Sequence, residues 1–459
     1  MKRVAIVGAG IGGLAVAHAL LKQAHRDRRL DVVVLERAPR AGGNIRTESI
    51  DGFLCEWGPN GFLDNAPATL DLVRDIGLAP RLQPSDDRAR RRYVFRYGAL
   101  HPLPGGPIDF ARSGLLSWPG KLRLAAEPFA RRRPDGDETI HAFAARRIGA
   151  EAADVLIDAM VSGVFAGDAR ALSLHACFPA MWQMEDAHGG LFRALLARRR
   201  RGGRRDGEAI GSPLGRLTSF RGGAEELVRG LVGALGTALR TGTEVQGMAR
   251  VGNRYRLAVT GGAAVDADAV VFAAGPATTA RIVRDIDVPL AETLEGLSQA
   301  APIAVICLGY RADRLPRPLD GFGFLVPRSE GVRTLGVLWD SSIYPGRAPE
   351  GSVLLRAMIG GATDPGAATL DDAQLLDVVR KDLRTTMGLD AMPELVRIIR
   401  HHAGIPQYTV GHLDRLRLAE QRLAALPGLA LAGNGYRGVS INTCIADAIP
   451  LADRLLAGR

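Results

Sequence analysis

A glycine-rich turn between two short apolar runs opens the chain and constrains its fold more than any other feature. The runs are residues 4–7 (VAIV) and 32–35 (VVVL), and the turn after the first run reads GAGIGG. A strand, a G-x-G-x-x-G turn, a helix and a second strand that ends in an acidic residue form the βαβ unit that binds dinucleotides. The sequence therefore predicts an α/β fold with a parallel sheet at its N-terminal end.

The glycines of this turn have separate mechanical roles. Gly8 permits the tight turn, Gly10 lets the backbone approach a pyrophosphate, and Gly13 lets the helix pack closely on the strand. The N-terminus of the helix offers N–H groups to the phosphates. Glu36 follows about twenty residues later, where its carboxylate can accept hydrogen bonds from ribose hydroxyls. We therefore expect a nucleotide along Gly8, Gly10, Gly12, Gly13 and Glu36.

A second glycine turn follows Glu36 and favours FAD over NAD as the cofactor. Residues 37–43 read RAPRAGG and resemble the extended FAD motif of amine oxidase-like and glutathione reductase-like flavoproteins. An enzyme that binds NAD alone has no need of this turn, whereas the longer FAD can use Arg40 and the backbone of Gly42 and Gly43. Taken alone, the Gly-Gly pair would indicate only a flexible loop.

The rest of the chain alternates between helical and strand patterns, and the dinucleotide-binding part is not contiguous. Apolar residues recur at helical spacing between 110 and 200, whereas 300–360 contains short β-branched runs that predict an antiparallel sheet. Residues 265–274 read as one return strand, and 429–431 as a terminal strand before a last helix. These strands can complete the first sheet only if other units are inserted between them.

We therefore predict an α/β protein with a discontinuous Rossmann-like FAD-binding domain, a mixed-sheet substrate domain and a helical insert. The FAD-binding domain is assigned to residues 1–85, 216–290 and 425–459. The substrate-binding domain is assigned to 86–108 and 291–424, and the helical insert to 109–215. An arginine-rich run at 198–205 in the insert indicates either a solvated loop or a contact with anionic lipid head groups.

Composition excludes several classes of protein. Hydrophobic residues make up 47% and charged residues 24% of the 459 residues, which argues against a wholly disordered or fibrous chain. No run reaches the ~18 apolar residues of a membrane-spanning helix. Four scattered cysteines without a C-x-x-C pair, and nine histidines without ligand spacing, argue against a disulfide framework or a metal site.

The net charge of +10 comes from arginine, since only four of the 59 basic residues are lysine. A GC-rich coding bias is one explanation, and attraction to acidic substrates or to a membrane surface is the functional alternative. No helix-turn-helix, zinc finger or RNA-binding signature accompanies the charge, so we expect no nucleic-acid partner.

Several motifs along the chain occur together in one family. The N-terminal ones are GAGIGGL (8–14), LERAPRAGGNIRT (35–47) and EWGPNGF (56–62), which amine oxidases and phytoene desaturases share. The combination of SGVFAGD (162–168), GFGFLVP (321–327) and GIPQY (404–408) with GH (411–412) is narrower. With the terminal GNGYRGVSINTCI (433–445), the whole chain resembles the oxygen-dependent, FAD-containing protoporphyrinogen oxidases.

The resemblance implies roles for individual residues. It places Asn60 close to the flavin as the catalytic residue and has Arg92 face a substrate propionate. It also implies that four residues line the tetrapyrrole cavity: Gly163, Phe322, Leu325 and Met358. Around FAD, besides the first turn and Glu36, it places Arg37, Gly42, Gly43, Val245, Gly433, Val439 and Ile441.

The residues themselves leave two of these assignments open. Without the resemblance, Phe322, Leu325 and Met358 would be interpreted as ordinary sheet core. The basic hairpin at 88–104 contains other arginines that are equally suited to a propionate, because a guanidinium fork matches any exposed carboxylate. These alternatives are Arg88, Arg90 and Arg91.

The activity that the resemblance implies is oxidation of protoporphyrinogen IX to protoporphyrin IX in heme biosynthesis, with dioxygen as acceptor and hydrogen peroxide as product. Loss of hydride from a bridge carbon leaves a delocalised cation, so the protein needs no strong base and the cofactor carries the difficult step. Oxidation of coproporphyrinogen III to coproporphyrin III stays open. So do an amine oxidase or carotenoid desaturase of the same fold, and a flavin-binding scaffold without turnover.

The expected location is the cytoplasm. Peripheral contact with the inner face of the cell membrane, a homodimer, and handover of the product to a ferrochelatase stay open as interactions.

Overall fold

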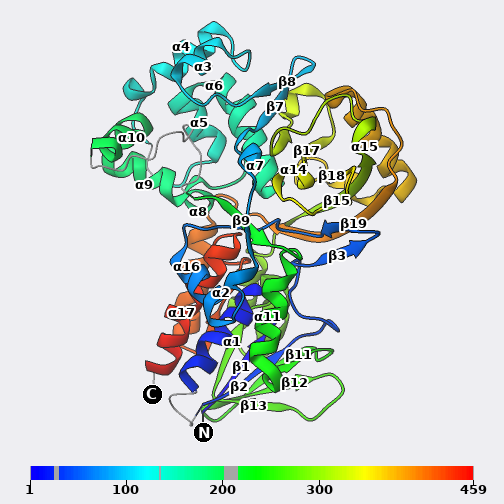
Figure 1. Cartoon of the computed structure of the whole chain (residues 1–459). Coiled ribbons are helices and arrows are strands. Elements are labelled where there is room, and N and C mark those ends of the chain that lie inside the picture. Colours follow the sequence, from blue (N-terminus) through cyan, green and yellow to red (C-terminus); the bar gives the residue numbers. More distant parts are fainter. Residues whose placement is uncertain (1, 25–29, 134–135, 201–214, 458–459) are drawn as a thin grey trace.

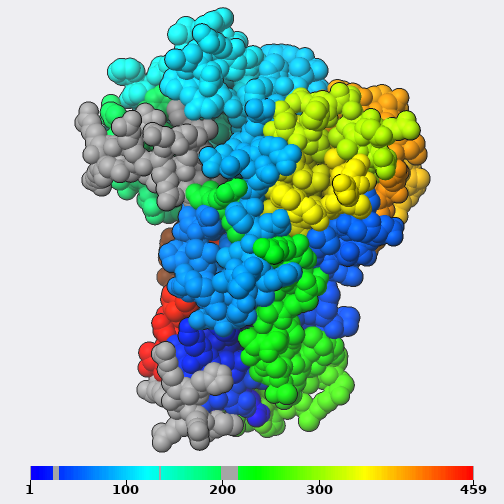
Figure 2. Space-filling view, in the orientation of Figure 1, coloured from blue at the N-terminus to red at the C-terminus, as the bar shows by residue number. Residues whose placement is uncertain are grey.

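A computed structural model of the chain describes residues 2–24, 30–133, 136–200 and 215–457. The molecule is elongated: the first strand and the last helix lie together at one end, and a group of helices and a large sheet lie side by side at the other (Figure 1). Figure 2 shows the same division as a narrower lower part and a broader upper part.

The lower part is built on a five-stranded sheet with the order β10-β2-β1-β14-β20. All of its pairings are parallel. Its strands are β1 (Lys2–Val7), β2 (Leu30–Leu35), β10 (Leu239–Arg240), β14 (Ala269–Phe272) and β20 (Leu429–Leu431). The predicted α/β class and the joining of distant segments into one sheet are therefore confirmed.

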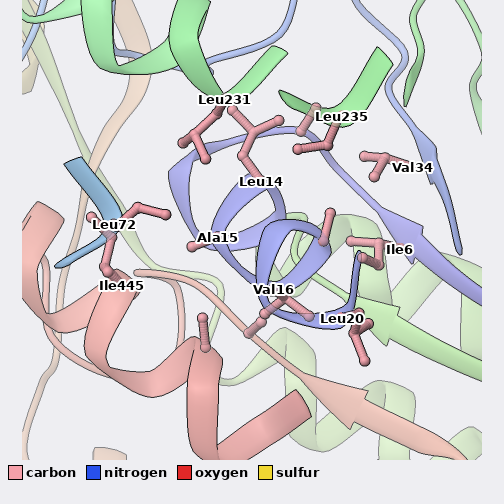
Figure 3. Close-up of a cluster of buried hydrophobic side chains, with 14 of the residues drawn as sticks. Ile6, Leu14, Ala15, Val16, Leu20, Val34, Leu72, Leu231, Leu235 and Ile445 are labelled. Carbon is pink, nitrogen blue, oxygen red and sulfur yellow. The ribbon is translucent and has the colours of Figure 1, made fainter. Parts of the chain in front are cut away.

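Helices cover one face of this sheet. Val4 and Ile6 of β1 belong to one core with Leu14 of α1. Figure 3 shows Ile6 and Leu14 in this core. The helices around this core are α1 (Ile11–Ala24), α2 (Pro67–Asp75), α11 (Glu225–Leu235) and α17 (Ile441–Ala457). Side chains alternate along a strand, so Ala5 and Val7 point to the opposite face. Because both faces are covered, the strand is apolar throughout.

A β-ribbon and three helices cover the other face. The ribbon consists of β11 (Val245–Val251), β12 (Arg254–Val259) and β13 (Val265–Ala267), and the helices are α12 (Pro276–Val283), α13 (Val288–Glu295) and α16 (His412–Ala424). The predicted substrate-binding domain includes 412–424, but α16 packs against α13 on this second face of the parallel sheet. The predicted boundaries of the three units otherwise stay a prediction.

The prediction of one strand at 265–274 was wrong. The segment divides at Asp268: β13 pairs antiparallel with β12, whereas β14 joins the parallel sheet. The carboxylate of Asp268 accepts a 2.7 Å hydrogen bond from the backbone N–H of Arg3 and lies 2.9 Å from Nε of Arg254. These contacts fix the chain where it passes from one sheet to the other.

The upper part contains a seven-stranded mixed sheet with the order β19-β15-β18-β17-β16-β7-β8. Its pairings are antiparallel except the one between β16 and β7. Its strands are β7 (Tyr93–Arg96), β8 (Ala99–Pro102), β15 (Ala300–Arg311), β16 (Gly323–Leu325), β17 (Thr334–Leu338), β18 (Ser352–Gly360) and β19 (Leu395–Pro406). Helix α15 (Asp372–Met387) packs in the core on one face, and the short α14 (Asp340–Ile343) follows β17.

The helical insert lies beside this sheet (Figure 1). Its helices are α3 (Pro107–Arg112), α4 (Trp118–Ala125), α5 (Ile140–Ile148), α6 (Ala150–Ala152), α7 (Asp158–Phe165), α8 (Leu174–Cys177), α9 (Pro179–His188) and α10 (Leu191–Arg200), with a π-helical turn at Ala153–Ile157. Residues 201–205 of the arginine-rich run lie outside the described residues. Of the helices that the structure describes, none has the length and hydropathy needed to cross a bilayer.

Short strands connect the two parts. They are β3 (Thr47–Ile50) with β4 (Phe53–Glu56), and a three-stranded sheet of β5 (Phe62–Leu63), β9 (Leu217–Phe220) and β6 (Leu82–Pro84). Strand β4 packs against β15 of the large sheet, so the loop after β4 reaches the surface of that sheet.

Candidate active site

Three glycines of the first turn are required by close backbone packing. A Cβ on Gly8 would lie 2.8 Å from the nitrogen of Ala274, and one on Gly13 would lie 2.0 Å from the carbonyl oxygen of Gly8. A Cβ on Gly12 would lie 2.7 Å from Cα of Gly433. The glycines therefore let α1 pack on β1 and bring the terminal glycine turn beside the N-terminus of α1.

Gly10 differs because it borders open space. A Cβ at Gly10 would meet no other described part of the chain within 4 Å. Gly43, at a φ of +57°, faces it, since a Cβ on Gly43 would lie 3.6 Å from Cα of Gly10. The N–H of Gly42 donates a 2.7 Å hydrogen bond to the carbonyl oxygen of Ala9, which holds the second turn against the first. A helix N-terminus with side-chain-free backbone on both sides fits a pyrophosphate, so these residues fit a dinucleotide.

The carboxylate of Glu36 is fixed by backbone donors at the end of β2. The N–H of Ala9 donates to Oε2 at 2.7 Å, and the N–H of Ala38 donates to Oε1 at 2.9 Å. Each oxygen of a carboxylate can accept a second hydrogen bond. Glu36 is therefore oriented beside the first glycine turn and keeps acceptor capacity for a ribose.

The two predicted arginines of the second turn have different environments. Arg37 is exposed. Arg40 donates from Nη2 to the carbonyl oxygen of Gly43 at 2.6 Å and from Nη1 to that of Ala41 at 2.9 Å. The guanidinium of Arg40 thus stabilises the turn that carries Gly42 and Gly43.

Three further predicted cofactor residues have different surroundings. Val245 is buried in one cluster with Val7 and Leu35, the last residues of β1 and β2. Ile441, the first residue of α17, lies in the core beneath the sheet. Val439, two residues earlier, packs against the insert instead. The terminal glycine turn therefore lies between the parallel sheet and the insert.

One face of the mixed sheet gathers predicted substrate residues. Leu325 pairs with Gly336, and Gly336 pairs with Met358, so the two side chains share a face across a residue without one. A Cβ on Gly163 of α7 would lie 2.5 Å from Cδ2 of Leu325. Strand and insert thus meet at this face, with Phe322 just before β16.

These apolar side chains differ in burial from the sheet core. Phe322, Leu325 and Met358 are each only partly buried. Their strand neighbours on the opposite face, Phe324 and Ala357, are 3% and 0% exposed. The face that carries Leu325 and Met358 is therefore an apolar surface that is still accessible to solvent.

The loop after β4 places Asn60 beside a buried ion pair. Nδ2 of Asn60 donates to Oδ1 of Asp340 at 3.3 Å, and Nε of Arg356 lies 3.0 Å from Oδ2 of Asp340. Arg356 also donates to the carbonyl oxygen of Gly58 at 2.7 Å. Oδ1 of Asn60 is buried and has no hydrogen-bond partner among the described residues.

Asp340 and Arg356 are 1% and 2% exposed. Burial raises the pKa of Asp340, and Arg356 opposes that shift. In turn, Asp340 raises the pKa of Arg356 above its ordinary value, although burial would lower it. Because Nε of Arg356 lies 3.0 Å from Oδ2 of Asp340, we assign the two as an ion pair. An ionised carboxylate only accepts hydrogen bonds. The amide nitrogen of Asn60 must therefore face Asp340, and its oxygen must face the other way.

Four arginines within residues 88–92 have unequal partners. Arg88 pairs with Asp86, Arg90 with Asp87 and Arg91 with Asp320. Arg92 is paired with no carboxylate of the described chain. Its guanidinium lies 5.0 Å from the ring centroid of Phe322, and burial lowers its pKa below the ordinary value.

Sequence reasoning missed Asp340 and Arg356. The signal for Arg356 was a charged residue inside the apolar strand SVLLRAMIG, since a charge inside such a strand needs a partner. No such signal marked Asp340, because the register between β17 and β18 brings the two together. In the parts of the chain that are described, no group of three or more His, Cys, Asp or Glu is placed to hold a metal ion.

Comparison with known proteins gives a consistent result. The family model of flavin-containing amine oxidoreductases matches residues 11–456. The chain is 31% identical to the coproporphyrinogen III oxidase of Bacillus subtilis (strain 168), over 97% of this chain and 96% of that protein. It is 34% identical to the protoporphyrinogen oxidase of Bos taurus, over 99% of this chain and 98% of that protein.

Solved structures agree in fold. A crystal structure of an Exiguobacterium sp. 255-15 protein has a TM-score of 0.85 at 27% identity, and covers 100% of this chain and 99% of its own. Reduced UDP-galactopyranose mutase has a TM-score of 0.76 at 15% identity, with 100% and 96% covered, a likeness of fold alone.

Proposed function

The chain belongs to the family of flavin-containing amine oxidoreductases, and from this premise we propose that it oxidises protoporphyrinogen IX to protoporphyrin IX. It is a flavoprotein oxidoreductase, and its cofactor is FAD, because a flavin must here occupy a fold built for a dinucleotide. The relatives named for porphyrinogen oxidation match nearly the whole chain, which supports this choice of substrate class.

Arg92 is the single observation that carries the proposal. It is a desolvated cation without a carboxylate partner in the described chain, and it stands against Phe322 at the edge of an apolar face. A flat macrocycle with acidic side arms needs this combination of an apolar wall and an arginine fork. Removing water from around a charged side chain costs free energy unless a counter-ion replaces it, so the site favours an anionic substrate.

The residues of the chain supply binding and orientation. FAD, once held there, would supply the acceptor for a hydride from a bridge carbon of the macrocycle. Leu325 and Met358 contact the faces of the rings, and Arg92 holds a propionate. Oδ1 of Asn60 is free to accept a hydrogen bond from a pyrrole N–H, which orients the macrocycle and stabilises the N–H as its acidity rises.

Three successive two-electron oxidations at bridge carbons remove six electrons from the substrate. We propose dioxygen as the acceptor, so that three molecules of dioxygen give three of hydrogen peroxide for each porphyrin formed. No described side chain has to act as a strong base for this sequence, because the cation left by hydride loss is delocalised over neighbouring pyrroles.

Coproporphyrinogen III is the second candidate substrate, and the similarity to the Bacillus subtilis protein favours it. It has four propionates in place of two. Arg88, Arg90 and Arg91 are already paired with acids, which supports the substrate with fewer carboxylates. Comparing kcat/KM for the two porphyrinogens, by porphyrin fluorescence under air, decides between them.

The same assay separates the proposal from its alternatives. An amine oxidase or a carotenoid desaturase would turn over amines or carotenoids and leave both porphyrinogens at the rate of non-enzymatic oxidation. A flavin-binding scaffold would turn over none of them. Formation of one peroxide for each two electrons removed supports dioxygen as the acceptor.

A membrane contact is a further part of the proposal. Helices α3 and α4 and the turn after α4 expose Ile108, Trp118, Leu122 and Phe129, with Phe129 87% exposed. Exposed basic residues stand nearby at Arg112 and Arg131. Aromatic and aliphatic side chains with basic neighbours suit the surface of an anionic bilayer. We therefore propose that α3 and α4 contact the inner face of the cell membrane from the cytoplasm. The homodimer and the handover to a ferrochelatase stay predictions.

A further inference from the structure

Two buried rings in the GIPQY and GH motifs have no role in the site described above. Tyr408 and His412 are each 1% exposed. Their ring centroids lie 4.3 Å apart at an interplanar angle of 33°. Both residues lie in the segment 405–412, which connects the mixed sheet to α16.

Both rings bond to the backbone of one turn. The hydroxyl of Tyr408 donates to the carbonyl oxygen of Asn434. Nε2 of His412 lies 2.9 Å from the carbonyl oxygen of Tyr436. A carbonyl oxygen only accepts, so Nε2 carries the hydrogen. Burial lowers the pKa of His412, which keeps the imidazole neutral, and burial raises the pKa of Tyr408, which keeps its hydroxyl protonated.

This turn, residues 433–436, is the terminal glycine turn at the cofactor cradle. Gly433 has a φ of +92°, and its Cα would lie 2.7 Å from a Cβ on Gly12. The C=O and N–H of a trans peptide point in opposite directions. Holding the carbonyl of Asn434 toward Tyr408 therefore turns the N–H of Gly435 away from Tyr408 and fixes that peptide plane.

The far end of the turn is held as well. The hydroxyl of Tyr436 donates to Oγ1 of Thr279 at 2.7 Å. The bonds from Tyr408 and His412 and the bond from Tyr436 to Thr279 thus hold the turn at both of its ends.

The same segment is bonded to the insert. Nε2 of Gln407 donates to the carbonyl oxygen of Phe165 at 2.8 Å, and the N–H of Ser173 donates to the carbonyl oxygen of Tyr408 at 2.8 Å. The segment 405–412 is therefore fixed on both sides, by the insert and by the glycine turn. Hydrogen bonds on both sides suit a rigid support.

We propose that Tyr408 and His412 are positioning residues for FAD: they fix the peptide planes of the turn 433–436 beside the N-terminus of α1, and so set how tightly the dinucleotide is held. The inference needs FAD but not the porphyrinogen. Its failure is therefore distinguishable from failure of the proposed substrate.

The test uses the holoenzyme and follows FAD release by the gain in flavin fluorescence after dilution. Tyr408→Phe and His412→Leu each remove one hydrogen bond to the turn, and we expect release of FAD to become roughly fivefold faster. His412→Gln keeps an N–H donor, and we expect release close to that of the parent protein.

Tyr255→Phe is the matched control. Tyr255 is also 1% exposed and donates to a carbonyl oxygen, that of Pro427, at 2.9 Å. Thermal unfolding measures what each variant loses in stability. We expect Tyr255→Phe to lose as much stability as Tyr408→Phe while releasing FAD at the parent rate.

Two results would overturn the proposal. One is parent-like release of FAD from Tyr408→Phe and His412→Leu. The other is equally fast release from the Tyr255→Phe control, which would reduce the role to general stability. If Tyr408→Phe does not fold, the pair His412→Leu and His412→Gln decides, because a positioning role requires that only the first accelerates release.

Discussion

The guanidinium of Arg92 lies 5.0 Å from the ring centroid of Phe322, while Nη1 of its neighbour Arg91 lies 2.5 Å from Oδ2 of Asp320. Two adjacent residues of one hairpin therefore differ in what they can bind. Arg91 is already neutralised at the surface, whereas Arg92 is half-buried and lacks a described acidic partner. A carboxylate that reaches this side of the sheet meets Arg92.

We expect Arg92→Ala to raise KM for the porphyrinogen by roughly tenfold or more and to lower kcat much less. A contact to a charged group is worth about 2 kcal/mol, and a propionate contact acts in the ground and transition states alike. Steady-state fluorescence assays measure both constants. Arg91→Ala is the control and should behave as the parent protein. An unchanged KM for Arg92→Ala would move the role to another arginine.

Substitutions at Gly10 and Gly12 should have separable effects. Gly10→Asp fits the protein itself, since no described neighbour lies within 4 Å of the added Cβ, but it puts a carboxylate where the pyrophosphate binds. We expect a folded protein without flavin. Gly12→Ala brings a Cβ to 2.7 Å from Gly433, and we expect a loss of stability of about 1–3 kcal/mol. Flavin absorbance and thermal unfolding give the two readouts, and normal flavin content in Gly10→Asp would contradict the assigned cradle.

Asp340 should act on the reaction through Asn60. We expect Asp340→Asn to lower kcat/KM roughly tenfold, because the amide of Asn60 loses its fixed orientation. In an Asn60→Ala background the same change should have little further effect, since residues that act together are not additive. Additive losses in this double-mutant cycle would mean that Asp340 is structural only.

Glu56→Gln is the control for that cycle. Glu56 and Arg347 form a second buried ion pair at 3.1 Å, and both are 1% exposed. Breaking either pair should cost about 3–5 kcal/mol of stability. Only Asp340→Asn should show coupling to Asn60 in kcat/KM.

The pH dependence of stability should include a contribution from His412. Burial lowers its pKa below 6.5, although its bond to Tyr436 opposes this shift. The unfolded chain therefore binds a proton near pH 6.5 that the folded chain resists, so stability falls as pH decreases below that value. We expect the unfolding temperature to drop between pH 7 and pH 5, and His412→Gln to show a smaller drop. Parallel curves for the two proteins would refute the assignment.

The exposed residues of the insert predict binding to anionic vesicles. We expect the double variant Trp118→Ser and Phe129→Ser to lose most of its co-sedimentation with phosphatidylglycerol vesicles. Met392→Ser is the control, because Met392 is 65% exposed but lies outside the insert. Equal binding by the parent protein and the double variant would rule out this face as the contact.

Local patterns made the dinucleotide cradle predictable from the sequence. Strand, glycine turn, helix and Glu36 lie within forty residues, and each is defined by its neighbours in sequence. The return strand was harder, because the sequence shows no break at Asp268. Its division into β13 and β14 depends on contacts to Arg3 and Arg254, which lie in other elements.

The substrate side depended more on tertiary contacts. Sequence could not separate Arg92 from Arg91, because the partner Asp320 lies far away in the chain. The ion pair of Asp340 and Arg356 likewise follows from strand register. The resemblance supplied Asn60, and only the structure shows which of its amide atoms is free.

Anaerobic mixing of the FAD-loaded protein with protoporphyrinogen IX in a stopped-flow spectrometer tests whether the bound flavin oxidises this substrate. We expect bleaching of the oxidised flavin band, with porphyrin absorbance appearing at the same rate, and return of the flavin band when air is admitted. A flavin band that stays oxidised with excess protoporphyrinogen IX, at a protein concentration where FAD is bound, would contradict this expectation.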